Sequence, residues 1–291
     1  MHKTPSFVFF GTPQFAVTIL NELEKKGLIP SLIITQEDKP RGRHLSITPP
    51  EVKVWAIERG IEIFQPKTLK DGSCVKYLKD RSPKNGWDVF VVASYGKIIP
   101  EEVLSLPHKG TLNVHPSLLP KLRGSSPIEG AILNEEKTGV SIMLLDKEMD
   151  HGPILAQKEV PIQPWPPYAP ELENTLAQEG GSLLAEILPR WINGSIEARD
   201  QDHSNATYTE KTRKEDAYIN LTDAPELNLK KIKAYSGWPN AYTFFTYKEK
   251  ELRLIIKSAH IENDTLILDT VIPEGKKEMP FKEFEKRFLP K

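Results

Sequence analysis

The first half of the chain alternates short, wholly apolar runs with segments in which apolar residues recur every three or four positions. Such short apolar runs are typical of parallel strands that are covered on both faces. Residues 154–162 alternate instead, so we expect them to pair antiparallel at an edge of the sheet. The whole pattern predicts an open α/β sheet of mostly parallel strands. We predict its strands at residues 7–10, 31–35, 61–64, 88–93, 111–115 and 140–145.

Helix start signals follow several of these strands. Thr12 and Pro13 supply a capping residue and a proline at the first helical position. Ser126, Pro127 and Glu129 match the capping box, again with proline at the first helical position. We predict one helix from each of these two positions. We predict two more, one over residues 51–59 and one within residues 170–192.

The second half begins with a change of composition. Residues 193–210 are polar and carry few large apolar side chains, so we interpret them as a linker. Beyond them lie a helical pattern at residues 224–235 and strand-like runs at residues 243–247, 252–257 and 265–272. We therefore predict two domains, residues 1–192 and residues 211–291.

Composition narrows the class of protein. The net charge of the 291-residue chain is −1, which gives no global sign of nucleic-acid binding but leaves room for a local basic patch. Cys74 is the only cysteine, so a disulfide framework or a cysteine-rich metal site is excluded. No apolar run approaches the ~18 residues of a membrane span, and the first residues do not resemble a signal peptide. We expect a cytoplasmic protein without a membrane partner.

Three polar residues lie at the ends of predicted strands. Asn113 and His115 share one face of the 111–115 strand, and Pro116 ends the strand behind them. Asp150 follows the 140–145 strand at a turn. Open α/β sheets bind their ligands at the carboxyl ends of strands. We therefore expect an amide, an imidazole and a carboxylate to meet there.

An amide, an imidazole and a carboxylate suit acyl transfer to an amine. The amide of Asn113 can donate to the oxyanion of a tetrahedral intermediate. The imidazole can move protons, and the carboxylate can orient it and accept a proton from the attacking ammonium. Two other interpretations stay open: hydrogen bonding at a strand end, and a metal site that uses His115, Asp150 and His151. Since asparagine is a poor transition-metal ligand, we expect no metal.

A long basic loop is the second candidate feature. Residues 37–50 hold Lys39, Arg41, Arg43 and His44. Strand-to-helix connections usually take about 2–6 residues, and long loops at the ligand end of a sheet are often functional. A merely solvated surface loop is the alternative. The turn sequence GTPQFA lacks the second and third glycines of the dinucleotide fingerprint, so we expect no nicotinamide cofactor.

The combined motifs resemble the folate-dependent formyltransferase family, and within it the enzymes that formylate methionyl-tRNA. The likeness covers nearly the whole length, and LNVHPSLLP with a later Asp-x-Gly is its most specific part. The matching segments include FFGTPQFAVTIL, ITQEDKPRGR, DVFVVASYGKIIP, LNVHPSLLPKLRGSSPI, TGVSIMLLDKEMDHGPIL, ATYTEKTRKEDAYI and AYSGWPNAYT.

This resemblance implies a fold and an activity. It implies a Rossmann-like N-terminal domain that binds 10-formyltetrahydrofolate, and a small OB-like β-barrel C-terminal domain that helps hold tRNA. The implied reaction moves the formyl group to the α-amino group of methionine on initiator methionyl-tRNA, for translation initiation. We expect a monomer.

The resemblance also assigns residues. Asn113, His115 and Asp150 become the catalytic trio. The implied folate-binding residues are Ser117, Leu118, Leu119 and Pro120, with the backbone at Val92, Tyr95, Gly96 and Ile98 lining the pterin pocket. The implied tRNA-binding residues are Lys39, Arg41 and Arg43.

The chain departs from the family in three places, one of which is the segment QPWPPYAPELE, longer and richer in proline than the family's usual link. His44, Leu45 and Ser46 stand where the family loop usually continues with glycine and two lysines, and the second domain is short. These departures bear on how tRNA is held and not on the chemistry. The alternatives are a formyltransferase that acts on an amino-sugar nucleotide and a non-catalytic RNA-binding relative.

The basic loop yields a first prediction. Arg43→Ala should weaken the use of charged initiator tRNA by about 1–3 kcal/mol, because a guanidinium binds phosphate through two parallel hydrogen bonds. Binding of a folate analogue should stay unchanged and serves as the control. The measurements are kcat/KM for charged tRNA and Kd for the analogue. Wild-type values of both kcat/KM and Kd would indicate that the loop is a solvated surface loop and does not hold tRNA.

Overall fold

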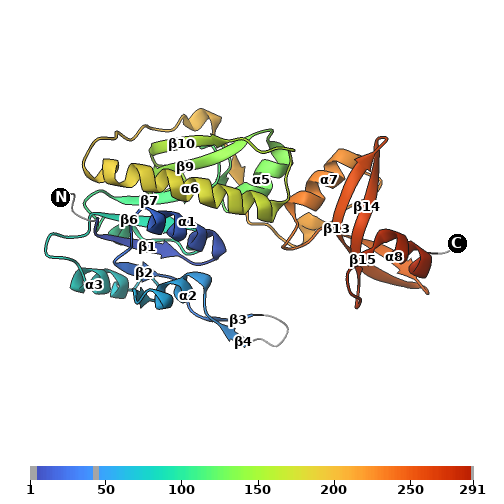
Figure 1. Ribbon diagram of the computed structural model, residues 1–291, viewed down its shortest axis with the longest axis horizontal. Coiled ribbons are helices and arrows are strands. Elements are labelled where there is room, and N and C mark those ends of the chain that lie inside the picture. The colour runs from blue at the N-terminus through green and yellow to red at the C-terminus, as the bar shows by residue number, and fades with distance from the viewer. Residues whose placement is uncertain (1–4, 42–45, 290–291) are drawn as a thin grey trace. The chain divides into compact units, whose positions relative to one another are not determined.

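The computed structural model describes residues 5–41 and 46–289. The chain divides into two compact units (Figure 1). Unit 1 holds the residues up to Arg123 together with Thr138–Val160 and Asn174–Tyr208. Unit 2 holds Gly124–Lys137, Pro161–Glu173 and Thr209–Lys291. These units interleave along the sequence, whereas we predicted consecutive segments, and residues 193–208 of the expected linker belong to unit 1.

Unit 1 is built on a seven-stranded sheet in the order β10-β9-β7-β6-β1-β2-β5. The five strands from β5 to β7 are parallel, while β9 runs antiparallel to β7 and β10 antiparallel to β9. The sheet is therefore mostly parallel, as the apolar pattern predicted, with the expected antiparallel edge strand. The strands are β1 (Phe7–Gly11), β2 (Leu32–Ile34), β5 (Glu62–Phe64), β6 (Val89–Ala93), β7 (Thr111–His115), β9 (Thr138–Leu144) and β10 (Ile154–Val160).

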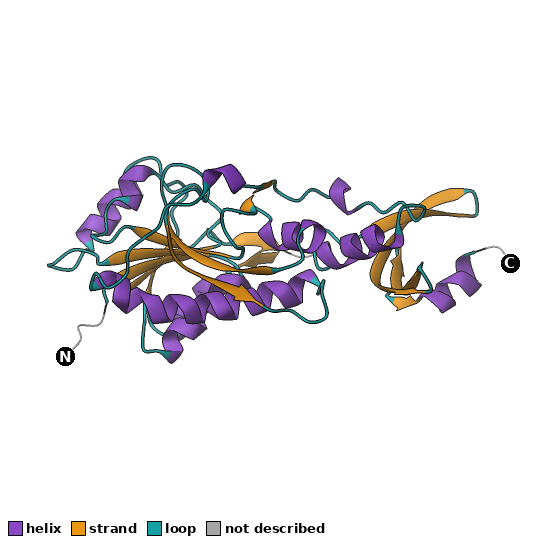
Figure 2. Cartoon of the chain, turned by 90° about the horizontal axis from the view of Figure 1, so that it is seen from above, coloured by secondary structure: helices purple, strands orange, loops and turns teal. Residues whose placement is uncertain are grey.

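Helices cover both faces of this sheet (Figure 2). Phe7 and Phe9 of β1 point into a core shared with α1 (Gln14–Lys25), α2 (Glu51–Glu58) and α6 (Ala169–Ile192). Val8 and Phe10 alternate to the opposite face, where they pack with residues of α3 (Ser73–Asp80) and α4 (Glu101–Leu104). Because both faces are covered, the central strands β1, β2 and β6 are apolar throughout and show no alternation in the sequence.

Two glycines let α6 pack closely on its neighbours. A Cβ atom at Gly180 would lie 2.7 Å from Val114 Cγ1 of the sheet, and one at Gly181 would lie 2.8 Å from Glu22 Cβ of α1. Both separations are shorter than van der Waals contact. Glycine at these two positions is therefore required by the close approach of α6 to the sheet on one side and to α1 on the other.

Unit 2 contains a small antiparallel sheet in the order β12-β13-β14-β15, so consecutive strands pair as a meander. Ile232 of α7 packs against Ile256 and Leu268 of this sheet, and Phe284 of α8 packs against Leu254 and Val271. This is the small C-terminal β domain that the resemblance implied. Its elements are α5 (Pro127–Asn134), α7 (Pro225–Ala234), β12 (Tyr242–Tyr247), β13 (Lys250–Glu262), β14 (Thr265–Pro273), β15 (Met279–Pro280) and α8 (Phe281–Phe288).

Three local predictions were wrong. Helix α1 begins at Gln14 with Pro13 at its N-cap, so Thr12 is not the capping residue, and its hydroxyl donates to the carbonyl of Tyr95. The long loop folds in part into a hairpin, with β3 (Lys39–Arg41) antiparallel to β4 (Ser46–Thr48). Helix α5 starts where expected, but Ser126 makes no capping bond to it. The hydroxyl of Ser126 instead accepts hydrogen bonds from the backbone N–H and the hydroxyl of Thr212. The remaining short elements are β8 (Arg123–Gly124), β11 (Tyr208–Thr209) and two 3₁₀ turns at His203–Asn205 and Glu215–Ala217.

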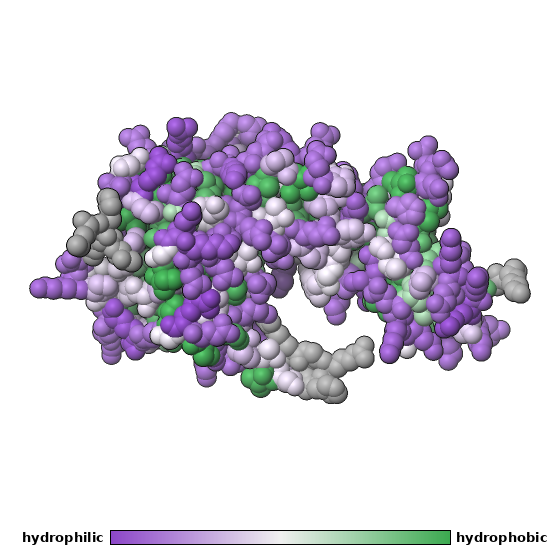
Figure 3. Space-filling view, in the orientation of Figure 1, coloured by the Kyte–Doolittle hydropathy of each residue, from purple (hydrophilic) through white to green (hydrophobic). Residues whose placement is uncertain are grey.

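On the face shown in Figure 3, hydrophilic residues cover most of the described surface of each unit, and apolar residues form small separate patches. Among the described residues, no helix combines the length and the apolar character needed to cross a bilayer.

The glycine contact of α6 yields a stability prediction. Gly181→Val should lower the free energy of unfolding by about 1–3 kcal/mol, because its branched side chain must displace Glu22 and the backbone of α1 at Ile19. The measurement is the urea midpoint followed by circular dichroism. Ser182→Val adds the same side chain at an exposed position of the same helix and is the matched control. Equal midpoints for the two variants would contradict the close packing.

Candidate functional site

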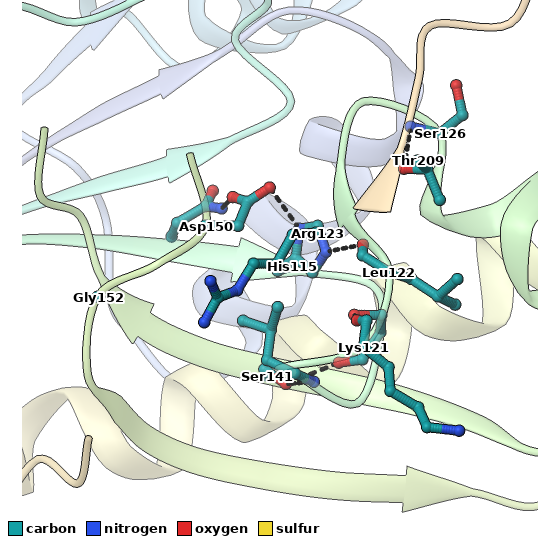
Figure 4. A network of polar contacts seen from close by, with 12 residues as sticks. His115, Lys121, Leu122, Arg123, Ser126, Ser141, Asp150, Gly152 and Thr209 are labelled. Carbon is teal, nitrogen blue, oxygen red and sulfur yellow. Dashed lines mark hydrogen bonds and ion pairs between the residues drawn. The ribbon is translucent and has the colours of Figure 1, made fainter. Parts of the chain in front are cut away.

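Asn113, His115 and Asp150 lie together in unit 1, and Figure 4 shows His115 beside Asp150. The amide Nδ2 of Asn113 donates to Oδ1 of Asp150 at 3.5 Å. Nδ1 of His115 lies 3.7 Å from the other carboxylate oxygen, Oδ2. His115 and Asp150 are buried, and Asn113 is partly exposed. The sequence prediction that these three groups meet is consistent with this geometry, and both contacts are long enough to shorten when a substrate binds.

Asp150 reaches the site by a route that the sequence did not indicate. Strand β9 runs antiparallel to β7, so Leu144 at its carboxyl end pairs with Leu112 and not with His115. Residues 145–152 must therefore fold back toward the carboxyl end of β7. The loop closes tightly, because a Cβ atom at Gly152 would lie 2.1 Å from the carbonyl oxygen of Leu144. Asp150 itself has φ +50°, in the left-handed region.

The tautomer of His115 follows from its second contact. Nε2 lies 2.9 Å from the carbonyl oxygen of Leu122. A carbonyl oxygen can only accept, so Nε2 carries a proton. Nδ1 is then the ring nitrogen that faces Asp150. The carbonyl of Leu122 is itself held in place, because the Leu122 N–H donates to Oγ1 of Thr207 at 2.8 Å.

The loop 117–120, which was predicted to bind folate, is tied to β9 and β10. The hydroxyl of Ser117 is buried and donates to the carbonyl of Lys121. Oγ of Ser141 accepts from the Leu119 N–H and donates to the Ser117 carbonyl. Nε2 of Gln157 donates to the Leu119 carbonyl and to Ser141. Ser117 thus shapes the loop from inside. Leu119 is buried, while Leu118 and Pro120 are partly exposed.

The predicted pterin-lining residues behave differently from one another. Val92 pairs with Asn113 across β6 and β7, which brings it to the site. The ring of Tyr95 lies in the core against Phe10, and burial, followed by the nearby Cys74, raises the pKa of its phenol. Gly96 has φ +77°, and Ile98 is exposed. The buried ring of Tyr95 is closed to a ligand, and the backbone carbonyl of this residue accepts hydrogen bonds from Thr12 and Gln36.

The basic hairpin is anchored at its base. Lys53 Nζ contacts both carboxylate oxygens of Asp38 at 2.8 Å. Gln65 donates to the same carboxylate, and these bonds from Lys53 and Gln65 lower the pKa of Asp38. Among the predicted tRNA contacts, Lys39 donates to the side chain of Gln36. Arg41 lies in β3, and Arg43 falls outside the described residues.

His151, the third residue considered for a metal site, turns away from the other two. Its Nδ1 lies 2.8 Å from Asp146, and its ring stacks on that of His203. Within residues 5–41 and 46–289, His, Cys, Asp and Glu side chains do not gather in groups suited to a metal ion.

Sequence reasoning missed several polar residues that surround the trio. Gln157 and Ser141 hold the 117–120 loop, and buried Arg123 contacts Gln201 and His203. Gln201 and His203 belong to the segment that was interpreted as a linker. Their only sequence signal was their polar character, which equally suits a solvated connection.

The family model described as "Formyl transferase" matches residues 6–188 of the chain. A curated methionyl-tRNA formyltransferase from Thermotoga neapolitana is 44% identical over 246 residues, which cover 84% of this chain and 77% of the relative. That of Dictyoglomus thermophilum is 40% identical over 302 residues, which cover 95% of each chain.

Solved structures share the fold at low identity. A 4-N formyltransferase from Francisella tularensis gives a TM-score of 0.66 at 17% identity, covering 90% of this chain and 100% of that one. A methionyl-tRNA formyltransferase from Clostridium thermocellum gives a TM-score of 0.59 at 16% identity, covering 92% of this chain and 98% of that one. HypX from Aquifex aeolicus in complex with tetrahydrofolic acid gives a TM-score of 0.63 at 16% identity, covering 99% of this chain and 48% of that one.

These structural likenesses establish the fold alone. The family rests on the sequence relatives and on the matched model, which together span the trio, the 117–120 loop and both units. The chain therefore belongs to the formyl transferase family, together with the methionyl-tRNA formyltransferases of these bacteria.

Proposed function

We propose that the protein transfers the formyl group of 10-formyltetrahydrofolate to the α-amino group of methionine on initiator methionyl-tRNA. The observation that carries this proposal is the convergence of Asn113, His115 and Asp150 at the end of β7, in a chain 40–44% identical to curated methionyl-tRNA formyltransferases. The proposed setting is translation initiation in the cytoplasm, with the protein acting as a monomer.

The proposed reaction begins with attack of the neutral amine on the formyl carbon. A C–N bond forms, and the formyl oxygen takes the negative charge. The N–H of Asn113 donates to this oxyanion, as does the imidazole when it is protonated. Asp150 accepts the proton that the amine nitrogen loses, directly or through His115. The bond between the formyl carbon and N10 of the folate then breaks, and N10 takes a proton.

The trio is already oriented for this chemistry. The Leu122 carbonyl fixes the proton of His115 on Nε2 and leaves Nδ1 toward Asp150. No covalent intermediate on the protein is needed, because the amine itself is the nucleophile. The low exposure of His115 and Asp150 strengthens their electrostatic interactions relative to those in water.

The formyl donor is proposed to lie beside the trio. The end of β6 at Val92, the backbone at Tyr95 and the 117–120 loop border the carboxyl ends of β6 and β7, which is where open α/β sheets bind ligands. Support for a folate comes from the family and from the tetrahydrofolic acid in the related HypX fold. The acceptor end of tRNA is proposed to meet Lys39, Arg41 and Arg43 of the basic hairpin.

An amino-sugar nucleotide is the second candidate acceptor. Solved structures titled as sugar formyltransferases share the fold, but at 16–18% identity they do not bear on the acceptor. The deciding experiment compares formylation of charged initiator tRNA with that of an amino-sugar nucleotide, each with 10-formyltetrahydrofolate. We expect turnover with the charged tRNA and none with the sugar nucleotide. Turnover only with the sugar nucleotide would overturn the proposal.

The role of Asn113 yields a prediction. Asn113→Ala should lower kcat by about 100-fold or more, the usual effect of removing one oxyanion donor. The KM values should change little, because the lost interaction forms mainly in the transition state. The measurement is steady-state formylation of charged tRNA. Asn174→Ala, at an exposed position of α6, is the matched control. Near-normal turnover of Asn113→Ala would remove it from the mechanism.

Asp150 yields a separate prediction. Asp150→Asn keeps the shape and one acceptor oxygen but removes the negative charge that takes up the proton. We expect kcat to fall at least as far as in Asn113→Ala, with the circular dichroism spectrum unchanged. A variant that retains more than about a tenth of wild-type kcat would contradict a role as proton acceptor, since such catalysis contributes about 10²–10⁴-fold.

A further inference from the structure

One side-chain amide closes the turn that carries Asp150. Nε2 of Gln201 donates to the carbonyl oxygen of Asp150 at 2.9 Å and to that of Gly152 at 2.7 Å. An amide nitrogen has two protons, and each is used once. Gln201 therefore holds both ends of the 150–152 turn and is itself 6% exposed.

The opposite side of this amide is fixed by a buried guanidinium. Oε1 of Gln201 accepts from Nη2 of Arg123 at 2.7 Å and from Nε at 3.1 Å. A guanidinium only donates and a backbone carbonyl only accepts, so the amide has one possible orientation. A carboxylate at this position would still receive Arg123, but its second oxygen would face two carbonyl oxygens.

The same segment makes a second contact with the turn. The rings of His151 and His203 stack at 4.1 Å between centroids and 4° between planes. Arg123 also holds the ring of His203 in this stacked position, because Nη2 of Arg123 lies 2.8 Å from Nδ1 of His203. Residues 199–203 and 150–154 are joined further by two backbone bonds between Ile154 and Arg199.

We propose that Gln201 is a positioning residue for the carboxylate of Asp150, an inference that rests on the proposed formyl transfer. No strand pairing fixes Asp150, whose loop folds back from β9, and its left-handed φ needs outside support. Catalytic groups must be held to within about 0.5 Å of their working geometry. Gln201 supplies that restraint through the backbone on either side of His151, without touching the reacting atoms.

The test separates the two sides of the amide. Gln201→Glu keeps the acceptor for Arg123 and removes both donors to the turn, while Gln201→Asn keeps the amide and withdraws it from the turn. Each should lower kcat about 10- to 100-fold, as expected when a reacting group moves by about 1 Å. The KM values for folate and tRNA should stay within about threefold, because Gln201 is buried and reaches the site only through the backbone of the turn. Gln178→Glu, the same exchange at an exposed position, is the control.

A double variant distinguishes positioning from general destabilisation. If Gln201 acts through Asp150, then kcat of Gln201→Glu/Asp150→Asn should equal that of Asp150→Asn alone. A further drop of the size seen in Gln201→Glu would overturn the inference, as would wild-type kcat in both single variants.

A readout without substrate keeps this inference separate from the proposed function. In Gln201→Glu, hydrogen exchange of the backbone amides in residues 145–152 should become faster than in Gln178→Glu. Equal exchange in the two variants would overturn the inference even if the protein formylates tRNA. Failure of the wild type to formylate tRNA, with faster exchange in Gln201→Glu, would overturn the proposed function and leave the restraint on the turn in place.

Discussion

The direction of β9 is the constraint on which the arrangement of this site depends. Strand β7 delivers an amide and an imidazole to its carboxyl end, but β9 runs the opposite way and ends beside Leu112. The carboxylate can reach the imidazole only on a loop that returns along the edge of the sheet. The end of that loop is held by the side chain of Gln201, which donates to the carbonyls of Asp150 and Gly152. The imidazole is held separately, because the Leu122 carbonyl that it contacts is fixed by Thr207.

The sequence was informative where burial is strong. Apolar runs located the strands of the large sheet other than β10, because a strand covered on both faces tolerates few polar residues. Strand β10, at the edge, was located by its alternating pattern. The two polar residues in the 111–115 run were conspicuous for the same reason. The direction of β9 could not be read from its residues, since a fully buried strand looks alike in either direction. Asp150 was thus placed at the site by an argument from strand ends that the topology does not support, although the resemblance pointed to the same residue.

Long-range polar contacts explain the other failures. Ser126 has the sequence of a helix cap, yet its hydroxyl receives two bonds from Thr212, which is remote in sequence. Residues 193–208 have the composition of a linker, yet Gln201 is buried and fully hydrogen-bonded. Local propensity describes what a segment does alone, and both segments gain more from distant partners than from local structure. The basic hairpin is a third case, because Asp38 at its base is held by Lys53 and Gln65.

The paired glycines of α6 matter beyond packing density. A helix that rests on its neighbours through flat, side-chain-free contacts on two sides has little freedom to turn about its axis or to slide, since either movement would bring the side chain of Ala177 or Leu184 into those contacts. Gly180 and Gly181 thus restrict the position of α6 on the sheet and on α1, and with it the position of its last residue, Ile192. The segment that begins there and runs to Gln201 starts from a defined point, so the carboxylate of Asp150 inherits its accuracy from two residues that have no side chain.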